Sequence, residues 1–152
     1  WNVTAIDWSE HALFLAERAA FAAGVTARFL LADAATWRPR REFDLVVLTY
    51  ALPTGGRAAP VIRNAAKALK PEGTIIIADW DRSMAATWDF DPSELHTPSA
   101  IAEMIPELRI GRAEVRLISD MFQPDDPRAF HGRWARVAVV VAQHSVDNNA
   151  SS

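Results

Sequence analysis

Cysteine is absent from this chain, which excludes a disulfide framework, a thiolate nucleophile and a Cys-ligated metal. Long apolar runs are also lacking, so the sequence shows neither a membrane-spanning segment nor a signal peptide. There is no excess of positive charge, because 16 Lys and Arg residues stand against 19 Asp and Glu residues. Non-specific nucleic-acid binding requires a basic surface and is therefore not expected. These absences predict a soluble cytoplasmic protein without membrane or nucleic-acid partners.

What is present is an ordinary globular composition in which half of the 152 residues are hydrophobic. This length suits one domain with a sizeable core. We expect that domain to span residues 1–143 and the polar residues 144–152 to form a disordered tail. Because the chain starts at Trp1 and enters an apolar run almost at once, we also expect it to be part of something longer.

Apolar β-branched runs alternate with segments of helical spacing along most of the chain. Ser9 is a good N-cap for a first helix that Gly24 would end, and Thr97 followed by Pro98 marks the start of a later helix. Residues 70–73, with sequence KPEG, would stop the second helix and turn the chain into a strand. Helices are expected at residues 10–23, 57–69 and 98–105, and strands at residues 2–6, 27–31, 43–50, 74–78, 112–118 and 134–142.

This order of elements predicts an α/β fold with a mostly parallel, doubly wound sheet. Residues 2–6 are nearly all apolar, which is typical of a strand buried on both faces. Residues 83–95 show no clear period and are expected to be loop or short helical pieces. The last two strands are joined by a loop rather than a helix, so they are expected to pair antiparallel.

Polar and aromatic side chains follow the expected strands, at the carboxyl edge where ligands bind in such sheets. Asp7 follows the first strand, and its two oxygens could accept both hydroxyls of a ribose; equally, Asp7 could only begin a turn or cap the next helix. Asp33 follows the second strand. The other strand-end residues are Trp8, Trp37, Thr49, Tyr50, Asp79 and Trp80, and Asp81 follows Trp80.

Several of these segments resemble those of class I S-adenosylmethionine-dependent methyltransferases, and most closely the small tellurite-resistance-type domains. The matching segments are residues 3–9 (VTAIDWS), 31–34 (LADA), 43–48 (FDLVVL), 68–77 (ALKPEGTIII) and 95–99 (LHTPS). Each motif is weak by itself, whereas their shared order and spacing make a specific signal for the family. The resemblance implies a Rossmann-like fold, S-adenosylmethionine as cofactor and methyl transfer to an acceptor.

The resemblance assigns roles to individual residues. Asp7 would bind the ribose hydroxyls of the cofactor, Asp33 would accept the adenine amino group, and the backbone of Ala34 would lie near the ring edge. Trp8 could pack on the adenine face or only cover the sheet end. Cofactor-binding candidates are Asp7, Trp8, Asp33, Ala34, Thr49 and Tyr50.

The family's first strand and its glycine-rich loop have no counterpart in this sequence. In the family's strand order, 3-2-1-4-5-7-6, that strand is central, between the strands that end near Asp7 and Tyr50. We therefore expect a sheet that is incomplete at its N-terminus, with two apolar edges that either lack a partner or close on each other.

The family's reaction requires alignment of nucleophile and methyl group and exclusion of water, so no catalytic residue and no metal ligand is assigned. Tyr50, Trp80 and Asp81 are candidates for contact with the acceptor, which we expect to be a small molecule. The four histidines lack metal-ligand spacing, and each is expected at the surface. Two alternatives remain: an NAD(P)-binding Rossmann oxidoreductase, in which an acid after the second strand also binds ribose, and a non-catalytic, degenerate methyltransferase-like domain.

Overall fold

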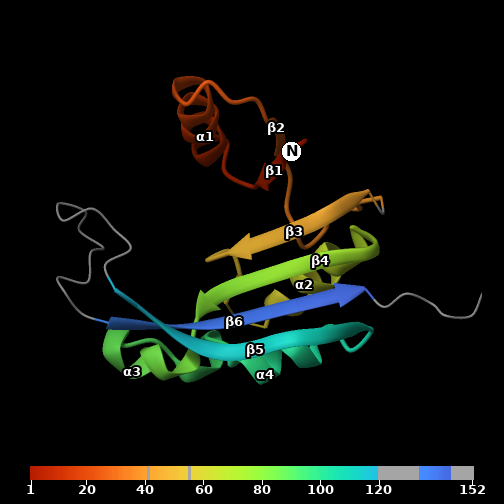
Figure 1. The fold of residues 1–152 in the computed structure, drawn as a ribbon. Coiled ribbons are helices and arrows are strands. Elements are labelled where there is room, and N and C mark those ends of the chain that lie inside the picture. The colour runs from red at the N-terminus through yellow and green to blue at the C-terminus, as the bar shows by residue number, and fades with distance from the viewer. Residues whose placement is uncertain (41, 55, 120–133, 145–152) are drawn as a thin grey trace, which may run out of the picture. The chain divides into compact units, whose positions relative to one another are not determined.

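The computed structural model describes residues 1–40, 42–54, 56–119 and 134–144 (Figure 1). Its chain divides into two compact units, Trp1–Arg38 and Pro39–Ser152, here called the N-terminal unit and the C-terminal unit. Each unit contains its own sheet, and each is described by itself. None of the described helices combines the length and the apolar character needed to cross a bilayer.

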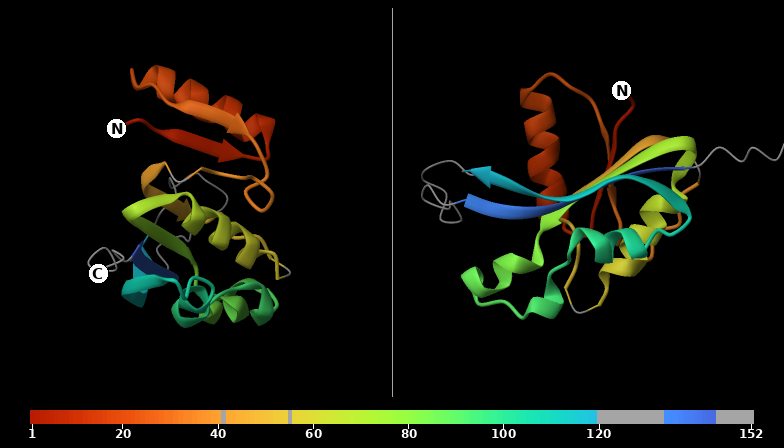
Figure 2. Two further views of the ribbon diagram at one scale, coloured as in Figure 1. Left: turned by 90° about the vertical axis from the view of Figure 1, so that its right-hand side faces the viewer. Right: turned by 60° about the horizontal axis from the view of Figure 1, so that its bottom comes forward.

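The N-terminal unit is a strand–helix–strand crossover. Strand β1 (Thr4–Asp7) pairs in parallel with β2 (Arg28–Leu31), and helix α1 (Glu10–Ala22) connects them and lies against one face of the pair (Figure 2). The predicted cap is confirmed, because the Ser9 hydroxyl accepts the Ala12 N–H at 3.2 Å. Gly24 follows the helix with a φ of +67°, a conformation that glycine adopts at little cost.

The C-terminal unit contains a four-stranded sheet in the order β3-β4-β6-β5. β3 (Phe43–Thr49) pairs in parallel with β4 (Leu69–Trp80), whereas β6 (Trp134–His144) is antiparallel to both β4 and β5 (Leu108–Ser119). Helix α2 (Ala58–Lys67) connects β3 to β4, and α4 (Pro98–Glu103) precedes β5. Between β4 and α4 lie three short helices, η1 (Arg82–Met84), α3 (Ala85–Trp88) and η2 (Pro92–Glu94), as predicted for this segment.

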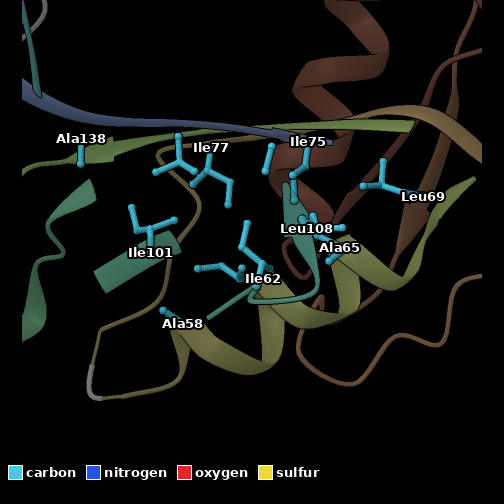
Figure 3. Close-up of a cluster of buried hydrophobic side chains, with 13 residues drawn as sticks. Ala58, Ile62, Ala65, Leu69, Ile75, Ile77, Ile101, Leu108 and Ala138 are labelled. Carbon is cyan, nitrogen blue, oxygen red and sulfur yellow. The ribbon is translucent and has the colours of Figure 1, made fainter. Parts of the chain in front are cut away.

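The core of the C-terminal unit lies between its sheet and the helices α2 and α4, which cover the same face (Figure 3). Alternate residues of β4 enter it, and Ile75 and Ile77 are fully buried against Ile62 of α2 and Ile101 of α4. Burial of an isoleucine side chain stabilises the folded state by about 1.5–3 kcal/mol. The predicted helical spacing of α2 and the Thr97 cap of α4, which accepts the Ala100 N–H at 3.2 Å, are confirmed.

Residues 70–73, predicted as a turn before the strand, instead lie inside β4, where the pairing with β3 is irregular: Phe43 pairs with Leu69 and Leu45 with Thr74. Glu72 has a φ of +63°, and its carbonyl accepts a hydrogen bond from the side chain of Gln143 at 3.0 Å. A Cβ atom added to Gly73 would lie 2.9 Å from the backbone oxygen of Lys70 and 3.0 Å from that of Phe43. Only a residue without a Cβ fits here unless the backbone moves.

Three sequence-based expectations need correction. The strand pairings are two parallel and two antiparallel among the described residues, so the sheet is mixed rather than mostly parallel, because β6 inserts antiparallel beside β4. The helices α2 and α4 share one face of their sheet rather than covering both. β1 is half-buried along its length rather than buried on both faces. An apolar run indicates that a strand can be buried, but it does not indicate which segments cover the strand. The expected antiparallel pairing of the last two strands is confirmed.

Most of the predicted tail, residues 145–152, and residues 120–132 of the predicted loop at 119–132 lie outside the described part of the chain. The tail's first residue, His144, belongs to β6.

Candidate functional site

In the N-terminal unit, two carboxylates follow neighbouring parallel strands. Asp7 is the last residue of β1 and pairs in register with Leu31, the last residue of β2. The Ala32 N–H donates to the Asp7 carbonyl at 2.9 Å, which carries the chain on to Asp33. Asp7 therefore lies at the carboxyl end of β1 and Asp33 two residues beyond that of β2, where α/β sheets bind ligands.

Each of the two carboxylates caps its own turn with one oxygen. Asp7 Oδ1 accepts the Ser9 N–H at 2.8 Å, and Asp33 Oδ1 accepts the Ala35 N–H at 2.8 Å. The turn-forming interpretation of Asp7 is thus correct for Oδ1. Oδ2 of each residue accepts no hydrogen bond from the described residues, so a second acceptor remains for a hydroxyl or amino group. These two acceptor oxygens fit an adenosine, whose ribose hydroxyls would donate to Asp7 and whose adenine amino group would donate to Asp33.

The other predicted residues of this unit surround the same strand ends. Trp8 follows Asp7 with its side chain 81% exposed, so it does not cover the sheet end in this structure. Ala34 is half-buried and lies between Asp33 and Ala35 in the turn that Asp33 caps. An exposed indole beside the acid suits stacking on a purine face.

In the C-terminal unit, the strand ends of β3 and β4 bring Thr49, Tyr50 and Trp80 together. Thr49 pairs with Ala78, and the Tyr50 N–H donates to the Ala78 carbonyl at 2.9 Å. The rings of Tyr50 and Trp80 are 4.5 Å apart, with an angle of 43° between their planes. Tyr50 has a φ of +51°, which is rare for an aromatic residue and turns its side chain out of the strand alternation.

The same edge holds a buried polar cluster of Asp79, Asp81 and His96, which the sequence analysis identified only in part. Their side chains are 7%, 5% and 8% exposed. Asp81 was predicted, and its carboxylate caps the next turn by accepting the Ser83 N–H at 3.0 Å. The expectation of a surface position for His96 is wrong, because its backbone pairs with Asp81 and this pairing draws it beneath the strand end. Asp79 was predicted at the strand end but was assigned no role, because its position after an apolar run was its only signal.

Burial dominates the electrostatics of this cluster. It raises the pKa of Asp79, an effect opposed by the N–H groups of Leu52 and Trp80, which donate to the carboxylate at 2.9 and 2.7 Å, and by His96. Burial lowers the pKa of His96, against the attraction of Asp79. The pKa of Tyr50 is raised by burial and then by the Asp79 charge. These shifts favour a neutral imidazole at neutral pH beside a phenol that keeps its proton.

Comparison with known proteins connects these strand ends to a family. Residues 1–73 match the family model described as a methyltransferase domain, and that segment contains both Asp7 and Asp33. The sequence similarity to methyltransferase domains thus covers the first 73 residues of the chain. No curated protein sequence matches the chain significantly.

Solved methyltransferase structures share the fold. A S-adenosylmethionine-dependent methyltransferase from Methanosarcina mazei matches with a TM-score of 0.75 and 17% identity, over 96% of this chain and 83% of its own. TehB from Haemophilus influenzae matches with a TM-score of 0.69 and 13% identity, over 95% and 50%. The N-methyltransferase NodS from Bradyrhizobium japonicum, in complex with S-adenosyl-L-homocysteine, matches with a TM-score of 0.64 and 17% identity, over 94% and 66%.

The strand orders also agree with the methyltransferase sheet. Within the units, the orders β1-β2 and β3-β4-β6-β5 correspond to the 2-3 and 4-5-7-6 parts of the order 3-2-1-4-5-7-6.

Proposed function

We propose that this methyltransferase domain binds the adenosine part of S-adenosylmethionine at the carboxyl ends of β1 and β2 and transfers the methyl group to a small-molecule acceptor. The observation that supports it most directly is the pair of strand-end carboxylates, Asp7 and Asp33, each with one oxygen left after capping its own turn. A charged acceptor oxygen that binds a ligand hydroxyl contributes about 1.5–3 kcal/mol.

The proposed roles follow from position and donor type. Asp7 binds the ribose hydroxyls, Asp33 with the Ala34 backbone binds the adenine edge, and the exposed Trp8 stacks on the purine. When bound, S-adenosylmethionine supplies an electrophilic methyl group on a sulfonium. Thr49 and Tyr50, at the end of β3, remain predicted cofactor-binding residues.

The acceptor side is assigned to Tyr50, Trp80 and Asp81. An electron-rich ring stabilises a nearby cation, so Tyr50 suits a sulfonium or a cationic acceptor. The net charge of −3 supports a small molecule over a nucleic acid, because phosphate-rich partners require a basic face.

Calorimetric titration of S-adenosylhomocysteine into the chain tests the proposal. Saturable binding is expected, and Asp7→Ala should weaken it about 10- to 100-fold, the ratio that corresponds to the loss of a charged hydrogen bond. Glu17→Ala is the matched control, because Glu17 is an exposed carboxylate on α1 of the same unit. Absence of binding, or equal binding by the Asp7→Ala variant, would contradict the adenosine site and favour the non-catalytic alternative.

A further inference from the structure

The buried polar cluster of Asp79, Asp81 and His96 is compact for a reason visible in the backbone. Asp79 and Asp81 are two residues apart at the end of β4, so their side chains leave the same side of the strand. His96 forms a parallel bridge with Asp81, and the Arg82 N–H donates to the His96 carbonyl at 3.1 Å. Three titratable side chains, each more than nine-tenths buried, therefore share one sheet end.

The hydrogen bonding of the cluster is complete at the acids and incomplete at the imidazole. Asp79 accepts the N–H groups of Leu52 and Trp80, and Asp81 accepts the N–H and hydroxyl of Ser83. His96 Nε2 is buried and has no hydrogen-bond partner among the described residues. A buried polar atom without a partner costs about 1–3 kcal/mol, a cost that a ligand group reaching it would remove.

The charges around this atom limit the kind of ligand. Asp79 lies close enough to interact electrostatically with His96, and Arg82 opposes it from the neighbouring turn. Asp81 is paired with His96 along the backbone. Two carboxylates in one cluster disfavour an anionic ligand, whereas an amine or a hydroxyl group is compatible with them. The neighbouring rings of Tyr50 and Trp80 provide an aromatic wall at the same edge.

We propose that His96 is the catalytic base on the acceptor side and that the methyl acceptor is protic, an amine or a hydroxyl compound. This assignment rests on the proposed methyltransferase function. In the step, the acceptor's lone pair forms the bond to the methyl carbon, the electron pair of the broken carbon–sulfur bond stays on sulfur, and the acceptor's proton passes to His96 Nε2. Asp79 is a positioning residue that stabilises the imidazolium formed.

The first test observes Nε2 directly in the wild-type chain. Long-range ¹⁵N NMR of the imidazoles distinguishes a bare acceptor nitrogen from a protonated one, and His→Asn variants assign the peaks. At pH 7 the His96 Nε2 signal should be that of a bare acceptor, and n-butylamine or n-butanol should shift it, while sodium butyrate should not. A protonated Nε2, a shift by butyrate alone, or no shift with any of the three probes would overturn the proposal.

The second test is enzymatic and uses labelled S-adenosylmethionine with n-butylamine or n-butanol as acceptor. His96→Gln should lower kcat about 10²- to 10⁴-fold, the usual contribution of a general base, and with n-butanol, which does not itself titrate here, it should abolish the loss of kcat/KM on the acidic side of the wild-type pH profile. His11→Asn is the control, because His11 is an exposed histidine on α1. An unchanged pH profile in the His96→Gln variant would contradict the assignment.

S-adenosylhomocysteine calorimetry on the same variants separates this proposal from the function on which it rests. Normal cofactor binding with no response at His96 would reject only the base, whereas absent cofactor binding would reject the methyltransferase function. A His96→Gln variant that binds S-adenosylhomocysteine normally is also shown to be folded.

Discussion

The two units of this chain differ sharply in how much hydrophobic surface they bury. In the N-terminal unit, where every residue from 1 to 38 is described, Leu13 is the one buried hydrophobic side chain, while Trp1, Trp8 and Phe21 are more than 80% exposed. The C-terminal unit contains a continuous cluster in which Ile62 and Ile75 are fully buried. The segment that is similar to methyltransferase domains, residues 1–73, spans parts of both units, so this similarity does not imply equal local stability.

This comparison has a consequence for dynamics and for function. Segments with few buried apolar contacts open at low free energy, whereas core strands open only with global unfolding. The proposed adenosine site is built on the less buried unit, and the proposed base belongs to the more buried one. Ordering of the N-terminal unit by a nucleoside would therefore oppose part of the binding free energy.

Truncation of the C-terminal core should have the largest effect on stability. Ile62→Ala removes a fully buried side chain of α2 and should lower the free energy of unfolding by about 2–5 kcal/mol, measured by urea denaturation. Leu13→Ala is the counterpart in the N-terminal unit and should change global unfolding much less, while it speeds amide exchange in α1. Equal losses from the two substitutions would show that the units unfold as one.

The local features of the fold could be predicted from the sequence because their causes are local. The Ser9 and Thr97 caps and the helical spacing around Ile62 depend on residues a few positions apart. The strand order of the family sheet could be predicted as well, through the resemblance. The exposure of β1 could not, because burial depends on which distant segments cover a strand.

In the candidate site too, residues with a local signal could be predicted, whereas those buried by distant segments could not. Asp7 and Asp33 were predictable because each directly ends an apolar run. His96 was not, because its burial arises from the pairing with Asp81, fifteen positions away in the printed sequence. The role of Asp79 as acceptor of the Leu52 N–H likewise depends on contact between segments that are distant in the sequence.

The two units should also differ in how much an aspartate contributes to stability, because Asp79 is buried and Asp33 is exposed. Asp79→Asn leaves one oxygen where two backbone N–H groups now bind, and its NH₂ group would face an N–H of Leu52 or Trp80. A loss of about 1–3 kcal/mol in the free energy of unfolding is expected. Asp33→Asn should stay within about 0.5 kcal/mol, because Asp33 is exposed and asparagine forms the same turn. Urea denaturation of both variants measures the difference, and a reversed order would contradict the contrast.

The pH dependence of stability should reveal the buried histidine. Burial lowers the pKa of His96 below 6.5 in the folded state, so between pH 6.5 and that lowered pKa the unfolded chain takes up a proton that the folded chain does not. Stability due to the neutral imidazole is therefore present above pH 6.5 and falls with decreasing pH, by at most about 1.4 kcal/mol per pH unit. Asp79 acts in the opposite sense, because its raised pKa makes the folded chain hold a proton more tightly.

The contribution of His96 to the pH dependence of stability is obtained by comparing the wild type with the His96→Gln variant. Urea midpoints of the wild type and of His96→Gln, measured from pH 7.5 to pH 5, should converge as the pH falls, since only the wild type has this acid sensitivity. His11→Gln, in the N-terminal unit, keeps His96 and should retain the wild-type slope. Parallel curves for wild type and His96→Gln would show that the imidazole is solvated.

The smallest effect is expected at the exposed edge of the C-terminal unit, where the ion pair of Lys70 and Asp44 joins β4 to β3. Lys70 Nζ lies 2.9 and 3.0 Å from the two Asp44 oxygens, yet the two side chains are 44% and 72% exposed. Exposed pairs contribute about 0.2–1 kcal/mol and are screened by salt. A double-mutant cycle of Asp44→Asn and Lys70→Met should give a coupling energy in that range, and it should decrease in 1 M NaCl. A coupling above 2 kcal/mol would mean that this edge is covered in solution. Exposed fractions would then be a poor guide to stability, and the low stability of the N-terminal unit, which is inferred from them, would lose its support.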